Sequence, residues 1–203
     1  RDSAALKLVG DRHALRRRQR VAVSRCSCAD EALARRQRRR VAPDALRRRD
    51  LAIDGFNCII TLETALAGGV VLVGRDGCCR DLSGVHGSYR WVCETPRVIE
   101  WLGEALGAAG VRSTWWVLDR PVSNSGRLKA LLLEIASRRG WPWQVELDFN
   151  PDRRLSETSA VVATSDAAVL DHCGSWVNLL GALVGVSTEA IWRVDLGRAA
   201  EGG

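Results

Sequence analysis

The sequence predicts an α/β fold in which a mostly parallel sheet carries helices on both faces. Short, mainly apolar runs at residues 51–53, 114–118 and 160–165 have the length of buried strands, and an aspartate follows each of them. Stretches with helical periodicity separate these runs along the chain. Alternation of strand and helix produces parallel strands joined by crossover helices, which then cover both faces of the sheet.

The composition is that of a globular domain with a small appendage. Of the 203 residues, 46% are hydrophobic and 27% are charged, and this length suits one core. No apolar run approaches the roughly 20 residues that span a bilayer. The chain begins at Arg1 and contains no methionine, so we expect its true start to lie upstream. The N-terminus has no hydrophobic signal core, and an export signal could be missing together with the true start, but a cytoplasmic location is still the expectation.

The seven cysteines predict reduced thiols rather than a disulfide framework or a zinc site. They stand at positions 26, 28, 58, 78, 79, 93 and 173, and no two of them have the Cys-x-x-Cys spacing of zinc ribbons and fingers. An odd number in a domain of this size fits buried thiols that act as small hydrophobic residues.

Positive charge is concentrated near the N-terminus. Residues 1–50 have a net charge of +10, whereas the other 153 residues have a net charge of −4. We therefore predict a basic helical N-terminal arm at 1–50, an α/β domain at 51–196 and a frayed tail at 197–203.

A basic arm favours an anionic polymer, here RNA, as its partner. The arm residues expected to bind the RNA backbone are Arg16, Arg17, Arg18, Arg20, Arg38, Arg39 and Arg40. The alternative is compositional, because arginine outnumbers lysine 28 to 2 and arginines also coat solvated helices.

Three helices and a turn are expected before the first strand. Residues 4–25 fit two short helices, and residues 29–40 fit a third with acidic residues in its first turn and arginines in its last. Pro43 then opens a helical turn. After the first strand, apolar residues at helical spacing predict a helix that Gly68 and Gly69 end.

A β-hairpin interrupts the alternation. Residues 70–73 and 78–82 flank the turn sequence Arg75-Asp76-Gly77, and we expect this hairpin to project from the main sheet. Thr95 and Pro96 open the next helix, which Gly110 ends.

The second half of the chain returns to alternating strands and helices. The strand at 113–118 precedes a helix whose apolar stripe comprises Leu128, Leu131, Leu132, Ile135 and Ala136. Residues 143–149 alternate between polar and apolar side chains, which is typical of an edge strand. A strand at 160–164, a helix and a fifth strand at 176–180 complete the sheet.

Three aspartates that end predicted strands form the candidate site. Parallel strands end at the same edge of a sheet, so Asp54, Asp119 and Asp166 are expected to lie within reach of one divalent ion. Crowded carboxylates repel one another unless a cation neutralises them, and Mg²⁺ and Mn²⁺ prefer oxygen ligands. Such an ion lowers the pKa of a bound water and stabilises the charge on an attacked phosphate.

Further residues extend this candidate site. Asp171, about one helical turn after Asp166, is a candidate fourth metal ligand. Asn57 is a candidate for orienting the metal-bound water or a phosphate oxygen. Free N–H groups at the helix start near Ser123 and Ser125 are expected to hold a phosphate of the RNA.

Other roles stay open for some of these aspartates. Asp166 is also suited to cap the next helix, Asp119 to begin a turn, and Asp171 to be a solvated helix residue. Asp54 has no such simple role, because Gly55 and Asn57 follow it.

Several blocks of the sequence carry a family resemblance. The blocks 54–57, 118–126 and 163–166, together with segments 8–12 and 18–20, resemble an uncharacterised prokaryotic family, domain of unknown function 434. More distantly, the Asp-Gly-x-Asn opening and the later Ser-Asp pair are similar to the PIN/NYN-like ribonuclease superfamily. That likeness implies a Rossmann-like fold in which Asp54, Asp119 and Asp166 bind Mg²⁺ or Mn²⁺ and Asn57 belongs to the site.

Three functions are consistent with the sequence. The first is a metal-dependent endoribonuclease of PIN/NYN type whose basic arm holds RNA. The second is a non-catalytic module of the same fold that binds RNA or a nucleotide. The third is a phosphatase with Asp54 as nucleophile, although Phe56 stands where enzymes of the haloacid dehalogenase type usually carry a second aspartate.

Overall fold

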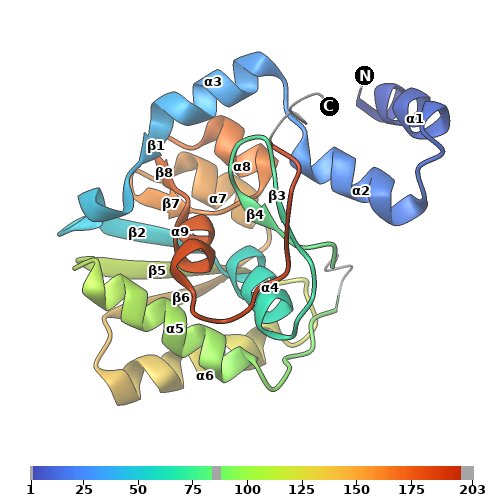
Figure 1. Ribbon diagram of the computed structural model, residues 1–203. Coiled ribbons are helices and arrows are strands. Elements are labelled where there is room, and N and C mark those ends of the chain that lie inside the picture. Colours follow the sequence, from blue (N-terminus) through green and yellow to red (C-terminus); the bar gives the residue numbers. More distant parts are fainter. Residues whose placement is uncertain (1, 84–87, 198–203) are drawn as a thin grey trace.

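The computed structural model of the chain describes residues 2–83 and 88–197, and its centre is a six-stranded, entirely parallel sheet (Figure 1). Its strand order is β1-β8-β7-β2-β5-β6. In that order the strands are Arg40–Val41, Trp176–Val177, Val161–Ala163, Asp50–Asp54, Ser113–Asp119 and Trp143–Asp148. The predicted α/β fold with a parallel sheet is confirmed, and β6 is the edge strand that its alternating pattern predicts.

Helices cover both faces of this sheet. On one face lie α4 (Gly55–Leu66), α5 (Thr95–Ala108), α6 (Ser125–Arg139) and α9 (Leu179–Val186), and on the other lie α3 (Asp30–Arg39), α7 (Pro151–Glu157) and α8 (Ala167–His172). Each face of the sheet has its own hydrophobic cluster, because successive side chains along a strand point to opposite faces. In β2, Leu51 and Ile53 join the cluster under α4, whereas Ala52 joins the cluster under α7 and α8.

The strand order contains one topological switch point. From β2 the chain proceeds through β5 to β6 on one side, and it then crosses back to β7 and β8 on the other side of β2. The helices that follow β2 and β7 therefore lie on opposite faces of the sheet. Ligands of open α/β sheets bind beyond the carboxyl ends of the strands at such a point.

A second, three-stranded sheet contains the predicted hairpin. Strands β3 (Val71–Val73) and β4 (Cys79–Arg80) pair antiparallel, and Gly77 in the turn between them has a φ of 77° that favours glycine. Strand β9 (Arg193–Asp195) joins β3 in parallel. The sequence predicted no strand at β9, because a three-residue segment is too short for its alternation to carry a clear signal.

The N-terminal helices α1 (Asp2–Arg12) and α2 (Arg17–Cys26) extend away from the α/β body, as Figure 1 shows. Helix α3, in contrast, packs on α8, and β1 pairs with β8 before the short 3₁₀ helix η1 (Pro43–Leu46) leads to β2. Within the described part of the chain, no helix is both long and apolar enough to cross a membrane.

A buried ion network fixes α3 to the body. Arg36 is only 3% exposed, and its Nη1 lies 2.5 Å from Asp76 Oδ2 in the hairpin turn while its Nε donates to Asp171 on α8 at 2.9 Å. Arg80 also binds Asp76, with its Nη2 donating to the same oxygen Oδ2 at 2.7 Å, and it donates from Nε to the Ser165 carbonyl at 2.9 Å. The guanidinium groups of Arg36 and Arg80 therefore join α3, the hairpin and the region from the end of β7 through α8.

The cysteines are free thiols, as the sequence predicts. Cys93 is exposed, Cys28 is half-buried and the other five are buried. Under native conditions we expect a thiol reagent to modify Cys93 at once, Cys28 more slowly and the others only on unfolding. In denaturant without reductant all seven should react. Recovery of five or fewer would demonstrate a disulfide and contradict this structure.

Candidate functional site

The carboxyl edge of the main sheet collects its aspartates on one face. Because side chains alternate along a strand, Asp54, Asp119 and Asp148 all belong to the face that α7 and α8 cover. Asp54 is level with Val117, so Asp119 lies two residues further along the neighbouring strand, where it is paired with Asp148. On the other side of β2, Ile53 is paired with Ala163 of β7, and Thr164 directly follows that strand.

Asp54 is the most deeply buried of the aspartates at this edge. It is 9% exposed, and its Oδ2 accepts a hydrogen bond from Thr164 Oγ1 at 2.7 Å. Burial raises the pKa of Asp54 to about 7 against the effect of that hydrogen bond, and the charges of Asp166 and Asp152 add to the rise. An ionised carboxylate at this position is therefore unfavourable without a compensating cation.

Asp152 is a member of the site that the sequence analysis did not identify. It lies in the first turn of α7, which Asn150 caps by accepting a hydrogen bond from Arg153 N at 3.1 Å. The charge of Asp152 acts on both Asp54 and Asp119, and Asp166 acts on Asp152 in turn. The motif Asn-Pro-Asp marks a helix start, but only the tertiary fold brings that start to the sheet edge. We call Asp54, Asp119, Asp152 and Asp166 the aspartate edge.

The other three aspartates of this edge differ in how far they are neutralised. Asp119 is half-buried and its carboxylate has no hydrogen-bond or ion-pair partner among the described residues. Burial first, and then the charges of Asp152 and Asp148, raise the pKa of Asp119. Loss of hydration and the charge of Asp166 raise the pKa of Asp152.

Asp166 has the capping role that the sequence left open. Its Oδ1 accepts hydrogen bonds from Ala168 N at 2.8 Å and from Val169 N at 3.1 Å at the start of α8. Both bonds end on the same oxygen, so Oδ2 is still available to a ligand.

Asn57 organises the loop that follows β7. Its Oδ1 accepts from Ser165 N at 2.8 Å and from Ser165 Oγ at 2.9 Å. Thr164 Oγ1 in turn accepts from Asp166 N at 2.9 Å. The polar residues predicted at the ends of β2 and β7 are thus joined at the switch point, and the amide Nδ2 of Asn57 is the donor left for a ligand.

The structure does not bring Asp171 to this edge. Its two carboxylate oxygens receive hydrogen bonds from Arg36 Nε at 2.9 Å and Nη2 at 3.0 Å, and Arg36 keeps the pKa of Asp171 below its usual value. Asp171 therefore belongs to the buried ion network and not to the site of the other aspartates.

The donor set of the aspartate edge fits a hydrated ion better than a closed metal cage. No group of three His, Cys, Asp or Glu side chains within residues 2–83 and 88–197 lies close enough together to hold a metal ion by itself. Mg²⁺, however, is commonly held by one or two carboxylates, with water and substrate phosphates as its other ligands. The free oxygens of Asp119 and Asp166 and the unfavourable ionised state of Asp54 fit such an open arrangement.

The predicted RNA-binding residues have different environments. Arg16, Arg17, Arg18 and Arg38 are exposed. Arg20 binds Asp11 and the Leu15 carbonyl, Arg39 binds the carbonyls of Asp171 and Cys173, and Arg40 stacks over Trp176. These three arginines therefore stabilise the fold itself.

Ser123 and Ser125 differ in the same way. Ser123 is exposed, whereas Ser125 is buried and donates to the Arg120 carbonyl at 3.3 Å.

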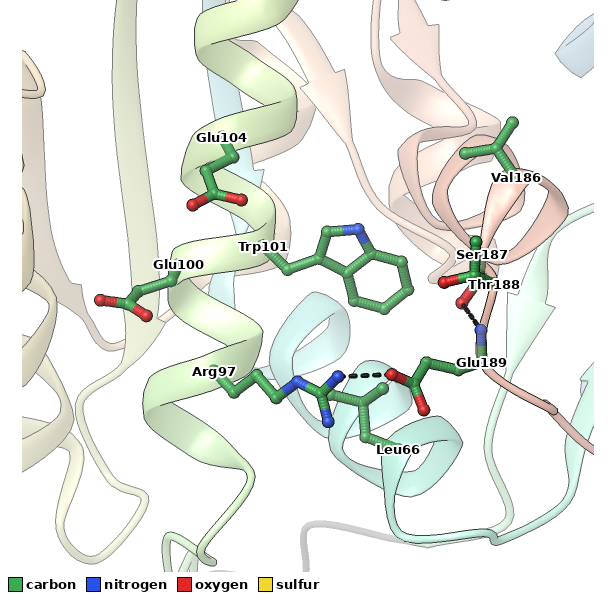
Figure 2. A pocket seen from close by; sticks show the side chains of 9 residues that line it. All are labelled: Leu66, Arg97, Glu100, Trp101, Glu104, Val186, Ser187, Thr188 and Glu189. Atoms are coloured by element: carbon green, nitrogen blue, oxygen red, sulfur yellow. Dashed lines mark hydrogen bonds and ion pairs between the residues drawn. The ribbon is translucent and has the colours of Figure 1, made fainter.

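A separate cavity of about 320 Å³ lies between α5 and the segment that follows α9, and Figure 2 shows its lining. Trp101 projects from α5 toward the segment that holds Ser187 and Thr188, Glu100 and Glu104 are further lining residues on α5, and Arg97 forms an ion pair of 2.5 Å with Glu189. None of the strand-end aspartates lines this cavity.

The fold and the site define an α/β domain with a carboxylate-rich edge at its switch point. The chain belongs to the family described as Domain of unknown function (DUF5616), whose model matches residues 43–182. Residues 1–39 match Protein of unknown function (DUF434), which confirms the predicted resemblance for the N-terminal helices, while the blocks at the strand ends lie within the first match.

An uncharacterised protein of Methanocaldococcus jannaschii is 27% identical over 166 residues, which is 82% of this chain and 79% of that relative. No solved structure matches the chain.

Proposed function

We propose that this protein is a metal-dependent endoribonuclease that hydrolyses RNA phosphodiesters at the aspartate edge. The observation that carries the proposal is the gathering of Asp54, Asp119, Asp152 and Asp166 at the switch point with no cationic partner for Asp54 or Asp119 among the described residues. Carboxylates that repel one another in this way are neutralised by a hard cation such as Mg²⁺ or Mn²⁺. The likeness of the Asp-Gly-x-Asn block to PIN/NYN-like ribonucleases supports the same reaction.

In this mechanism Asp54 and Asp119, on neighbouring strands, would hold the ion, and Asp166 Oδ2 at the start of α8 would be a further ligand. A bound Mg²⁺ or Mn²⁺ supplies a water of lowered pKa and neutralises charge at the attacked phosphate. Thr164 orients Asp54 through its 2.7 Å hydrogen bond. Asn57 Nδ2 would donate to a phosphate oxygen, and the charge of Asp152 would favour the ion.

The test is cleavage of a labelled single-stranded RNA by the purified protein with Mg²⁺, Mn²⁺ or a chelator. Endonucleolytic products that depend on the metal and vanish with the chelator are expected. Products of equal yield with and without chelator would refute the metal-dependent mechanism, and the absence of all cleavage would refute the nuclease.

A non-catalytic RNA-binding module is the second candidate. It is favoured by the fact that the aspartates, as they stand, form no three-ligand group within the described residues. Saturable binding of RNA without any cleavage would establish it.

A phosphatase is disfavoured. Phe56, at the position of a second acid, is buried and packs edge-on against Tyr89 with ring centroids 5.2 Å apart.

We also propose that the exposed arginines of the arm hold the RNA backbone, in the cytoplasm, where seven free thiols fit a reducing compartment. Replacement of Arg16, Arg17 and Arg18 by alanine is expected to reduce the slope of log K against log salt by up to about 2, since each phosphate that is no longer neutralised accounts for about 0.7. Fluorescence anisotropy with a single-stranded RNA between roughly 50 and 300 mM salt measures this slope.

The matched control for these arginines is another exposed run, Arg47-Arg48-Arg49. It directly precedes β2 and so lies at the end of that strand opposite to Asp54. Its replacement by three alanines should leave the slope nearly unchanged. An equal decrease of the salt slope in both variants would mean that RNA binding depends only on net charge and that the arm is not a specific binding surface.

A further inference from the structure

A pocket at the start of α6 carries side chains that suit a single nucleotide. It has a volume of about 300 Å³ and is lined by Tyr89, Arg90, Trp91, Asn124, Arg127 and Leu128. Trp91 is 52% exposed, so much of its indole is open to solvent. We call this cavity the Trp91 pocket.

The segment that carries Trp91 is fixed to the loop after β5. Tyr89 N donates to the Ser123 carbonyl at 3.3 Å, and Asn124 Nδ2 donates to the Tyr89 carbonyl at 2.7 Å. The Tyr89 ring is buried against Phe56, and its hydroxyl donates to Glu63 at 2.5 Å. The position of Trp91 is thereby tied to α4, the helix that begins next to Asp54.

The Trp91 pocket lies at the same end of the sheet as the aspartate edge. Asp119 ends β5, and α6 begins six residues later at Ser125. Both sites therefore lie at the carboxyl ends of the strands, the pocket on the face that α6 covers and the aspartates on the face that α7 and α8 cover.

Positive charge in the pocket is unpaired. Arg90 and Arg127 are exposed and form no hydrogen bond or ion pair with any residue that the structure describes. Helix α6 also begins without a side-chain cap, and Asn124 before it adopts the left-handed conformation with a φ of 68°. Its positive N-terminal end therefore faces the same region as the two guanidinium groups.

We propose that the Trp91 pocket binds one nucleotide of a single-stranded nucleic acid. The base stacks on the Trp91 indole, and its flanking phosphates bind Arg90 and Arg127. Aromatic stacking next to arginines is how proteins bind single strands without reading their sequence. This proposal rests on the proposed function only for the onward path of the strand to the aspartate edge, because binding itself needs no catalysis.

The test measures binding of a fluorescein-labelled ten-residue oligouridine in the presence of chelator, so that cleavage plays no part. Trp91→Ala is expected to weaken binding about 5- to 100-fold, whereas Trp91→Phe, which keeps an aromatic face, should retain most of it. Arg127→Ala should also weaken binding and reduce the salt slope by about 0.7. Unlabelled oligothymidine should compete, but a duplex of equal length should compete poorly because its bases are already stacked.

Two matched controls separate the pocket from general surface effects. Trp192 is 62% exposed and lies outside the pocket, and Arg138 is an exposed arginine near the other end of α6. Trp192→Ala and Arg138→Ala should bind like the unmodified protein.

Wild-type affinity in Trp91→Ala, or equal competition by the duplex, would overturn the proposal. If RNA is cleaved but Trp91→Ala binds normally, the pocket fails and the nuclease stands. If Trp91→Ala loses binding and no RNA is ever cleaved, the nuclease fails and the pocket stands.

Discussion

Asp54→Asn is expected to abolish metal-dependent RNA cleavage and, at the same time, to stabilise the fold at neutral pH. Asparagine keeps the size of the side chain and still accepts the hydrogen bond of Thr164, but it removes a charge that only a cation compensates. Loss of several kcal/mol of metal-based transition-state stabilisation corresponds to a rate decrease of at least about 10³-fold.

The effect on stability depends on pH, because the pKa of Asp54 is about 7 in the folded protein and close to 4 when unfolded. A raised pKa in the folded state means that the native protein loses stability as pH increases from about 4 through 7. The variant should lack this loss, so it should gain roughly 1–4 kcal/mol at pH 8 without metal and nothing at pH 3. Urea unfolding at both pH values measures the difference.

Asp50→Asn is the control for this variant. Asp50 begins the same strand at the opposite edge of the sheet and pairs with Arg112 at the surface. Its replacement should leave cleavage unchanged. If Asp54→Asn were less stable than the unmodified protein at pH 8, Asp54 would be a structural residue and the proposed site would be wrong.

Arg36→Ala should produce the largest loss of stability in the protein. The substitution leaves Asp76 buried and only partly compensated by Arg80, and it exposes Asp171 to water. Removal of one partner from a buried ion pair destabilises a protein by about 3–5 kcal/mol. Chemical denaturation of this variant at pH 7 measures the loss.

Acid should destabilise the unmodified protein through the same ion network. Burial alone would raise the pKa of Asp76, but the hydrogen bond and charge of Arg80, together with Arg36, lower it below its ordinary value. The stability that Asp76 contributes is therefore complete above an ordinary carboxyl pKa and is lost as the pH falls through the lowered value.

The control for Arg36 is Arg112→Ala at the exposed pair with Asp50, where the loss should be small. Equal losses in the two variants would show that the buried ion pairs stabilise the fold no more than the exposed pair does.

Because Arg80 also holds the Ser165 carbonyl, a folded Arg36 variant is further expected to bind Mn²⁺ more weakly.

The sequence was sufficient to predict the architecture, and it named some of the residues that lie at the candidate site. Apolar runs that end in aspartate identified β2, β5 and β7, since short buried strands carry a continuous hydrophobic signal. Asp152 could not be found in this way, because its place above the sheet follows from how α7 packs and not from any local pattern.

The buried ion network was equally hidden from the sequence. Arg36 looked like one of many arginines of a solvated arm, and Asp171 looked like a helix residue near the site. They are 135 residues apart in the sequence, and only folding brings them together. The cost of burying a charge without a partner explains why this arginine differs from its neighbours on α3.

The most direct test of the central claim is a calorimetric titration of the metal-free protein with Mn²⁺ at pH 7. The aspartate edge predicts saturable binding that releases protons, because Asp54 must ionise to hold the ion, and Asp54→Asn should lose that binding while Asp50→Asn keeps it. No saturable binding to the unmodified protein, or equal binding to Asp54→Asn, would contradict a metal site at this edge and with it the proposed nuclease.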